Sequence, residues 1–426
     1  MNAKKILYLC DLNLTNGGAQ RITFKTLGCL SKMFNIIVYM PEKPSHESLS
    51  LLSSLRIEYI LDTELNIERL KSTIISKKID LILIQWENFH WIFLAYQIKK
   101  SMGIEYVVFV HELPVIGTPT GKIKSWYFEV YLKLLRIFYN RILDMRYKEA
   151  GKNSTNQVAR ALKIKKNVSL NLMLKTMAEI LFTIKGLKSA KKIIAMGPAS
   201  KFYIDNYLKL GNIIELKHVA APDIIVNTDL YNKSYIYDIC FMAARLEPEK
   251  GIFDMLVIVH YIKKIVNYNI KAVVLGRFIN DRTEKIFLSK IKELDLESNI
   301  FLLGFVSEEE KINILCSSKV FLYPSTKDVF SISLADALAC GLPVVVFDLP
   351  FVRQFDQVGI NKVKYRDINA MSTKVIELLN LFIKERAKYN NLRETISKNL
   401  ISSFSWDITC NEQVQAISVA FDDIHH

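Results

Sequence analysis

The stretch KVFLYPSTKDVFSISLADALACGLPVVVFD, residues 319–348, contains a complete strand–loop–helix–strand unit. Its two apolar runs, KVFLY and PVVVFD, predict strands, and the segment of small and apolar residues between them predicts a helix. Strands this uniformly apolar are typical of a parallel sheet that helices cover on both faces. The polar loop and the helix also carry two acids, Asp328 and Asp336, which lie eight positions apart.

The same alternation of apolar runs and helical segments extends through the whole chain. Before this stretch, YDICFMAAR, IKAVVLGR and NIFLLGFV follow one another with helical segments between them. The first half repeats the pattern with KILYLC, FNIIVYM, IDLILIQW, EYVVFV and KKIIAM. Repeated strand-then-helix units predict parallel, doubly wound sheets. We therefore expect an α/β protein with two Rossmann-like domains, whose parallel sheets face a cleft.

A length of 426 residues fits two or three domains better than a single core. We place the N-terminal domain at 1–215 and the C-terminal domain at 216–403, with a linker near 211–234. Ligands of parallel sheets bind beyond the carboxyl ends of the strands, so the loops that follow the apolar runs are expected to line the cleft.

The six cysteines stand singly along the chain, and no CxxC pair occurs. We interpret them as small buried side chains of a protein in a reducing compartment, not as disulfide partners or zinc ligands. The apolar run near the N-terminus is too short for the core of a signal peptide. No run approaches the roughly 20 residues of a spanning helix. These features predict a soluble or peripheral protein of the cytoplasm.

The net charge of +14 is concentrated in residues 121–192, which hold 17 lysines and arginines but only four acids. Apolar residues recur there at three- and four-residue spacing from Trp126 to Ile142, which predicts an amphipathic basic helix. Such a helix suits a membrane surface that carries acidic lipids. A solvated pair of helices packed on its own domain is the alternative. Nucleic acid is not expected, because no finger, RNP or helix-turn-helix motif accompanies the charge.

Three loops that follow apolar runs carry residues suited to an anionic or hydroxyl-bearing ligand. Gly17 and Gly18 precede a helix, where close backbone approach and free N–H groups favour a phosphate, although a plain turn has the same composition. His111 follows EYVVFV and could exchange a hydrogen bond with a hydroxyl, or be a structural residue. Arg245 and Lys250 lie in RLEPEKG, before a helix, and form a candidate diphosphate site or else a surface turn paired with its own glutamates.

The two acids of the opening stretch allow two interpretations on spacing alone. Asp328 lies in the loop after a predicted strand, where it can face the cleft. Asp336 lies in the next helix, where SLAD, residues 333–336, has the form of a capping box with Ser333 as N-cap. The residues by themselves leave open whether Asp336 binds a ligand or caps the helix.

Taken together, these loops resemble those of the GT-B retaining glycosyltransferases of the GT4 family. NGGAQR is similar to the family's GGAER, VHELP to its HD or HE segment, and ARLEPEKG to GRLxxEKG, while LGFVSEEE also matches. YPSTKDVFSISLADALACGLPVVVFD resembles PSxxEGFGLxxxEAMAxGxPVV. FSWDITCNEQVQAI resembles the family's final helix, which implies that 404–426 crosses back to the first domain. The resemblance covers most of the chain but is weakest over 121–192, which looks like an elaboration of the first domain.

The resemblance implies a catalytic role for four residues. His111 would lie near the reacting sugar, and Asp328 would hold hydroxyl groups of the donor sugar. Arg245 and Lys250 would neutralise the diphosphate as it leaves, because fixed cations stabilise a growing negative charge most in the transition state. Since cations of the protein take this role, the resemblance implies neither a metal ion nor a cofactor.

The resemblance also implies that a second group of residues binds the nucleotide-sugar donor. The two glycines would approach the diphosphate or the acceptor, and the LGR and LGFV turns would frame the base. Backbone N–H groups at the start of the helix would reach the phosphates, and the helical acid would bind the ribose diol. These residues are Gly17, Gly18, Gly276, Arg277, Phe305, Val306, Phe330, Ser331, Ile332 and Asp336.

The chain departs from the family's pattern inside the donor segment. Asp328 and Asp336 stand where the family has glutamates, which shortens the reach of each acid by about 1.5 Å. Val329 and Ser331 replace the glycines of EGFG, so close approach of the backbone is less free. These departures leave the identity of the donor sugar open.

The combined pattern predicts a hexosyltransferase that moves a sugar from a UDP- or GDP-sugar to a glycan or lipid-linked acceptor. We expect it to act as a peripheral protein on the cytoplasmic face of an anionic membrane. The basic segment favours a lipid-linked acceptor, and retention of configuration follows from the resemblance alone. Two alternatives stay open, namely a nucleotide-sugar epimerase on the same fold and a non-enzymatic membrane-associated subunit.

Overall fold

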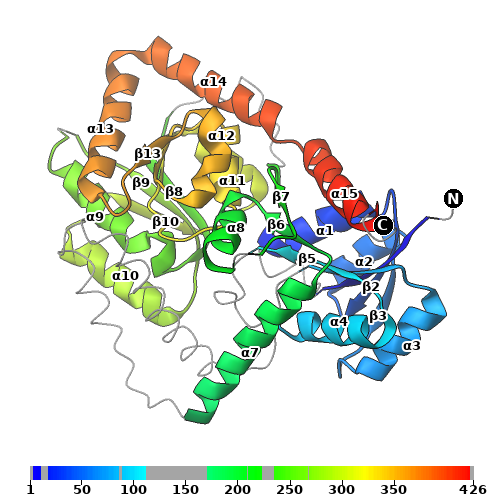
Figure 1. Ribbon diagram of the computed structural model, residues 1–426. Coiled ribbons are helices and arrows are strands. Elements are labelled where there is room, and N and C mark those ends of the chain that lie inside the picture. Colours follow the sequence, from blue (N-terminus) through cyan, green and yellow to red (C-terminus); the bar gives the residue numbers. More distant parts are fainter. Residues whose placement is uncertain are drawn as a thin grey trace.

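The computed structural model of the protein describes residues 3–10, 18–85, 89–111, 170–208, 210–222, 235–266 and 268–422. The chain forms two domains, each built on one sheet of parallel strands, and the C-terminal helix lies on the first domain (Figure 1). Gly17 lies outside the described residues. So do residues 112–169, which include most of the basic segment expected at 121–192.

The N-terminal sheet has seven strands in the order β3-β2-β1-β4-β5-β6-β7, and all neighbours are parallel. Its central strands are buried almost completely, because their residues are apolar on both faces. The strands are β1 Lys5–Leu9, β2 Asn35–Met40, β3 Glu58–Leu61, β4 Leu81–Ile84, β5 Tyr106–Val110, β6 Lys192–Met196 and β7 Ile213–Leu216.

Helices cover both faces of this sheet. Side-chain caps begin two of them, since Ser45 accepts a hydrogen bond from the Ser48 N–H and Asn66 accepts one from the Glu68 N–H. The core of one face includes side chains of α1 Gly18–Leu30, α2 His46–Ser54 and α15 Trp406–Asp422. The core of the other includes α3 Ile67–Lys77, α4 Phe89–Met102 and α7 Leu170–Ser189.

The C-terminal sheet has six parallel strands in the order β10-β9-β8-β11-β12-β13. The strands are β8 Tyr237–Leu246, β9 Ala272–Phe278, β10 Ile300–Gly304, β11 Ser318–Tyr323, β12 Val344–Phe347 and β13 Asn361–Val363. One face carries α9 Ile252–Lys263, α10 Asp281–Glu293 and α13 Ile368–Lys384. The other carries α11 Glu308–Cys316, α12 Ile332–Ala339 and α14 Arg386–Ser403.

The prediction of two Rossmann-like domains with parallel sheets is confirmed by these topologies. Three strands were not predicted, namely β3, β7 and β13, and β7 lies inside the segment expected to be a linker. Each has only three or four residues and is at most partly buried as a whole, so none has the long apolar run of the other strands. Backbone pairing with β2, β6 and β12 makes these segments strands.

The crossing of the C-terminal helix to the first domain is also confirmed. α14 packs on α12 of the C-terminal domain, whereas α15 packs on α1 (Figure 1). The rings of Phe34 and Phe421 stack with centroids 5.7 Å apart, and Lys25 Nζ lies 5.1 Å from the ring centroid of Trp406. The chain therefore passes from one domain to the other between Ser403 and Trp406.

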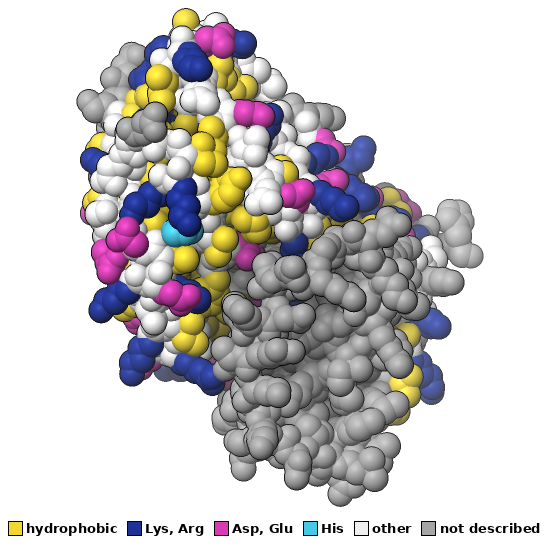
Figure 2. All heavy atoms as spheres, turned by 90° about the vertical axis from the view of Figure 1, so that its left-hand side faces the viewer, with side chains coloured by type: hydrophobic (Ala, Val, Ile, Leu, Met, Phe, Trp, Pro, Cys, Tyr) yellow, Lys and Arg dark blue, Asp and Glu magenta, His cyan; other side chains and the backbone are white. Residues whose placement is uncertain are grey.

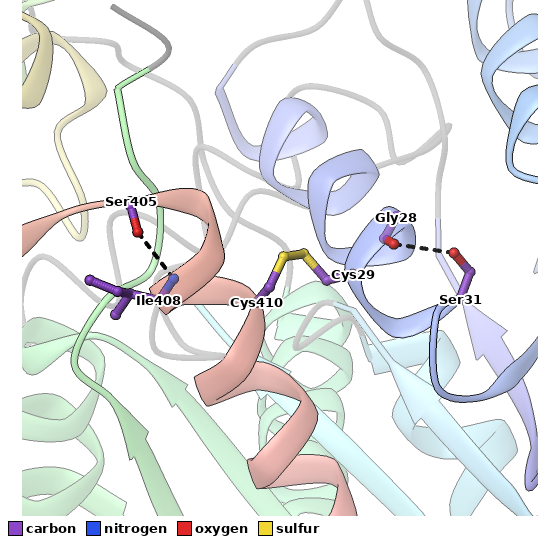
Figure 3. The surroundings of a disulfide bond; sticks show 6 residues. All are labelled: Gly28, Cys29, Ser31, Ser405, Ile408 and Cys410. Carbon is purple, nitrogen blue, oxygen red and sulfur yellow. Dashed lines mark hydrogen bonds between the residues drawn. A yellow bond between two sulfur atoms is a disulfide. The ribbon is translucent and has the colours of Figure 1, made fainter. Parts of the chain in front are cut away.

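The expectation that all six cysteines are reduced is wrong for two of them. Cys29 of α1 and Cys410 of α15 form a disulfide across this helix contact, with Cα atoms 5.2 Å apart (Figure 3). The other cysteines of the described residues form no disulfide and are all buried: Cys10, Cys240, Cys316 and Cys340. The two partners are 381 residues apart in sequence, so no local spacing could indicate the pair.

We expect four of the six thiols to react with a thiol reagent when the protein is unfolded without reductant. Cys29→Ser should raise this count to five because it releases Cys410, while the control Cys240→Ser should lower it to three. Loss of the disulfide should also destabilise the fold by about 2–4 kcal/mol. Six reactive thiols in the untreated protein would show that the two cysteines are not bonded.

Exposed apolar side chains gather on the outer surface of the C-terminal domain (Figure 2). On α9 the exposed residues Val257 and Tyr261 lie one turn apart, and Ile265 follows a further turn along the chain. The opposite side of α9 is buried in the core, so this helix is apolar nearly all round. Within the described ranges, no helix is both long and apolar enough to cross a membrane.

Candidate functional site

The loops that follow β8 and β11 are bound to each other at the carboxyl edge of the C-terminal sheet. The two strands are parallel neighbours, so both loops leave the sheet at the same edge. The Thr326 backbone N–H donates to the Glu249 carbonyl oxygen at 2.9 Å, and Thr326 Oγ1 donates to the same oxygen at 3.0 Å. Gly251 permits this contact, because a Cβ there would lie 2.1 Å from the Pro324 carbonyl oxygen.

Lys250 and Asp328 join these two loops through an ion pair, with 2.9 Å between Lys250 Nζ and Asp328 Oδ2. The Tyr323 hydroxyl donates to the same carboxylate oxygen at 2.6 Å, and the Val329 N–H donates to Oδ1 at 2.9 Å. The structure thus brings together two residues that the sequence placed in separate loops. Tyr323 was not predicted, although its position as the last residue of a strand before a candidate loop could have indicated it.

Burial and charge act in opposite directions on this pair. Burial alone would lower the pKa of Lys250 and raise that of Asp328, but each charge stabilises the other. Hydrogen bonds from Tyr323 and the backbone add to this effect on the carboxylate. The result is a raised pKa for Lys250 and a lowered pKa for Asp328. Both groups are therefore charged at neutral pH, and a sugar hydroxyl bound to Asp328 would share its carboxylate with Lys250.

Two arginines occupy the carboxyl ends of neighbouring strands in the same sheet. Arg245 of β8 pairs in register with Arg277 of β9. The Arg245 side chain is 62% exposed and lies 3.6 Å from the carboxylate of Glu247. Two cations at this edge, beside the strand that leads to Lys250, suit a doubly charged diphosphate.

The predicted base-binding turns after β9 and β10 also come together. The Arg277 guanidinium lies 4.6 Å from the ring centroid of Phe305, and Phe305 is 67% exposed. Gly276, Arg277 and Gly304 border a cavity of about 290 Å³. Val306 is partly buried and packs on the core of its own domain. An exposed aromatic ring under a guanidinium is suited to contact with a planar ring such as a base.

The helix of the opening stretch begins two residues earlier than its capping box predicted. The N-cap of α12 is Ser331, whose side chain accepts a hydrogen bond from the Leu334 N–H at 3.2 Å. Ser333 lies inside the first turn, so the expected box with Ser333 as N-cap is wrong. Asp336 lies beyond the first turn and does not cap the helix.

Asp336 forms an ion pair with a lysine that the sequence did not indicate. It is 3% exposed, and its Oδ2 accepts a hydrogen bond from Lys311 Nζ of α11 at 2.8 Å. Burial alone would lower the pKa of Lys311, but the carboxylates of Asp336 and Glu308 raise it above its usual value. Asp328 and Asp336 thus have different lysine partners. The binding of a ribose diol by Asp336 stays a prediction.

The start of α12 lies against the N-terminal domain. Phe330 and Ile332 are partly buried and pack on the core of that domain, while Phe330 also packs on the core of its own. The N–H groups of Ile332 and Ser333 are in the first turn, where no acceptor exists within the helix. Such N–H groups suit a phosphate oxygen. Gly18, the other helix-start residue, is the first residue of α1.

His111 lies at the carboxyl end of β5 and is 7% exposed. Its Nε2 lies 3.2 Å from Gln85 Nε2, and its backbone carbonyl oxygen accepts a hydrogen bond from Ser200 Oγ at 2.5 Å. Burial lowers the pKa of His111 to about 4, and a hydrogen bond with the Gln85 backbone offsets this only in part. The ring is therefore neutral at physiological pH and cannot act there as a cation.

We expect acidification from pH 6.5 to 4 to destabilise the N-terminal domain through His111. The pKa of His111 is about 4 in the folded protein and 6.5 in an exposed chain. In this window the unfolded chain binds a proton that the folded domain does not, so the free energy of unfolding falls by about 3 kcal/mol. Denaturant titrations across this range should show the decrease, and His111→Gln should reduce it. If the free energy of unfolding falls equally with pH in the unaltered protein and in His111→Gln, the decrease does not come from His111.

Among the described residues, no group of three or more His, Cys, Asp or Glu side chains could hold a metal ion. The candidate site is instead built from lysines, arginines, backbone N–H groups and an exposed aromatic ring. The arrangement can bind an anion beside a hydroxyl-bearing group.

Residues 232–398, which span most of the C-terminal domain, match the family model Glycosyl transferases group 1. A search of curated proteins finds no match to the chain.

Solved structures of glycosyltransferases share the fold over nearly the whole chain. A glycosyltransferase from Rickettsia africae is 13% identical with a TM-score of 0.67, and 99% of each chain is covered. Sucrose-phosphate synthase from Thermosynechococcus elongatus is 14% identical with a TM-score of 0.65, covering 99% of this chain and 100% of its own. HepE from Anabaena, in complex with UDP and glucose, is 12% identical with a TM-score of 0.64, with the same coverage. The architecture is therefore that of the GT-B glycosyltransferases.

Proposed function

We propose that the protein is a retaining hexosyltransferase of the GT4 type. It would transfer a sugar from a UDP- or GDP-sugar to a glycan or lipid-linked acceptor at the cytoplasmic face of a membrane. The observation that carries the proposal is the cationic carboxyl edge of the C-terminal sheet. There Asp328 holds Lys250, on the loop that follows the strand of Arg245.

These cations suit the charge that develops in the reaction. Cleavage of a sugar–phosphate bond leaves negative charge on the nucleotide diphosphate, and preorganised cations stabilise that charge most in the transition state. The family match of residues 232–398 and the HepE complex with UDP and glucose support a nucleotide-sugar donor. The three cations Arg245, Lys250 and Arg277 would take the role of charge stabilisation without a metal ion or cofactor.

The proposed membrane acceptor is supported by charge and by an apolar surface. Residues 121–192 hold 17 basic residues, and α7, inside that range, exposes Leu181 and Phe182. Basic and apolar side chains together bind anionic lipid surfaces. Acidic replacements of Lys163, Lys165 and Lys166 should reduce binding to anionic vesicles. If the acidic replacements leave vesicle binding unchanged, the proposed contact with a membrane surface is contradicted.

Thermal-shift screening with UDP, GDP, ADP and their sugars tests the donor first, because binding to the folded state raises its stability. Turnover with lipid-linked acceptors then tests transfer. Product analysis with the donor alone separates transfer from epimerisation, which needs no acceptor. The proposal fails if no nucleotide binds and no donor is consumed.

A further inference from the structure

The carboxylate of Asp328 accepts hydrogen bonds from three groups in the described part of the chain. Its Oδ2 accepts from Lys250 Nζ at 2.9 Å and from the Tyr323 hydroxyl at 2.6 Å, while its Oδ1 accepts from the Val329 N–H at 2.9 Å. Burial opposes ionisation, but the charge of Lys250 and these hydrogen bonds lower the pKa of Asp328. The group is therefore an ionised carboxylate, which can only accept hydrogen bonds.

The number of places left on this carboxylate limits what it can bind. An ionised carboxylate accepts at about four sites, two on each oxygen. Lys250 and Tyr323 occupy both sites of Oδ2, and the Val329 N–H occupies one site of Oδ1. Two hydroxyls of a sugar ring would need two free sites. Asp328 has one, on Oδ1, so it has room for one sugar hydroxyl.

The Tyr323 hydroxyl is fixed on Oδ2 by the packing of its ring. Tyr323 is 2% exposed, and its ring centroid lies 5.9 Å from that of Phe321 and 6.4 Å from that of Phe351. The side chain of Ser331, the N-cap of α12, also forms a hydrogen bond with Tyr323. Burial and the Asp328 charge raise the pKa of Tyr323, so the hydroxyl keeps the proton that it donates to the carboxylate.

Lys250 can contact an anion without leaving Oδ2. Its ammonium group has three N–H donors. One is directed at Asp328 Oδ2, and a second at the Lys327 carbonyl oxygen, which lies 3.4 Å from Nζ. The third remains for an oxygen of the diphosphate. Binding of the diphosphate therefore does not require the ion pair to open, and both sites of Oδ2 stay occupied.

We infer that Asp328 binds a single hydroxyl of the donor sugar, and that Tyr323 is a specificity-determining residue because it excludes a second one. The inference rests on the proposed function, since it concerns the sugar of the donor. Its consequence is that Asp328 makes no contact with the hydroxyl on the neighbouring ring carbon. This carboxylate should therefore accept nucleotide hexoses together with their deoxy and epimeric forms at that carbon.

Binding of a nucleotide hexose and of its 2-, 3-, 4- and 6-deoxy forms tests this count, with the nucleotide chosen by thermal-shift screening. Calorimetry gives the Kd of each deoxy form divided by the Kd of the parent hexose. Such ratios, taken within one protein, cancel a general loss of affinity. Asp328→Asn should lower the ratio of one deoxy form about tenfold, because a charge-assisted hydrogen bond becomes a neutral one. The other three ratios should not change.

Tyr323→Phe tests the exclusion of the second hydroxyl. The substitution frees a site on Oδ2, so the deoxy form altered at the neighbouring carbon should bind about tenfold more weakly relative to the parent hexose. Tyr389→Phe is the matched control. Tyr389 is also fully buried, but its hydroxyl donates to the Lys319 carbonyl oxygen at the opposite end of β11. This control should leave all four ratios unchanged.

Three results would overturn the inference while the donor still binds and the proposed function stands. Asp328→Asn could lower two ratios, or it could lower none. Tyr323→Phe could have the same ratios as the unaltered protein, and this variant decides alone if Asp328→Asn does not fold. If the unaltered protein binds no nucleotide hexose at all, the proposed function fails and the inference fails with it.

Discussion

Lys250→Met is expected to lower kcat for sugar transfer by about 100- to 1000-fold. The substitution removes the cation that the Asp328 carboxylate holds at 2.9 Å between the two site loops. The side chain of Asp328 is only 12% exposed, and the substitution leaves its negative charge without the lysine partner. Removal of one partner from a buried pair costs about 3–5 kcal/mol, so the C-terminal domain should also lose stability.

A matched pair and a double variant separate these two effects. Lys263→Met breaks an ion pair of the same length with Asp295, whose side chain is 92% exposed, and it should cost less than about 1 kcal/mol. Lys250→Met combined with Asp328→Asn removes both charges, so it should recover part of the stability but none of the activity. Denaturant titration and initial rates measure both quantities. If Lys250→Met unfolds at the same denaturant concentration as the unaltered protein and retains full turnover, the proposed role of Lys250 is contradicted.

Gly251→Ala is expected to destabilise the C-terminal domain by on the order of 3 kcal/mol and to reduce transfer about 100-fold. Gly251 has φ of +80°, which costs an alanine roughly 1–2 kcal/mol. An added Cβ would also lie 2.1 Å from the Pro324 carbonyl oxygen, which is backbone and cannot rotate away. The loop that carries Lys250 would therefore move away from the loop that carries Asp328.

The same substitution at Gly211 is the control, because nothing lies within 4 Å of a Cβ there. Gly211→Ala should change the free energy of unfolding by less than about 0.5 kcal/mol. Thermal denaturation and initial rates of both variants measure the contrast. Equal stability of the two variants would show that the loops following β8 and β11 do not depend on close contact at Gly251.

Much of the fold could be predicted because strand and helix signals are local. The apolar runs of residues 319–348 became β11 and β12, and the segment between them became α12, as their composition indicated. β3, β7 and β13 were missed for the opposite reason, since these short segments are strands only through pairing with β2, β6 and β12. The cap of α12 was misplaced because Ser331 and Ser333 satisfy the same local pattern, and only the backbone geometry selects between them.

The sequence predicted which types of residue form the candidate site, but it predicted less well which of them contact one another. The motif that contains Arg245 and Lys250 and the loop that contains Asp328 both indicated a charged site at strand ends. The lysine partner of Asp336 did not follow from any motif, because Lys311 lies 25 residues away in another helix. Tyr323 and Gln85 were missed since each is an ordinary strand-end residue until its hydrogen-bond partner is known.

The sequence by itself determined the alternation of strands and helices, the two parallel sheets and the loops that carry the cations, because each depends on local composition. Only the tertiary structure decided which groups meet. Lys250 and Asp328 are 78 residues apart, Gln85 and His111 are 26 apart, and Cys29 and Cys410 are 381 apart. Such contacts depend on how strands are ordered and helices cross, since a short-range interaction acts only between groups that the whole fold brings within a few ångströms.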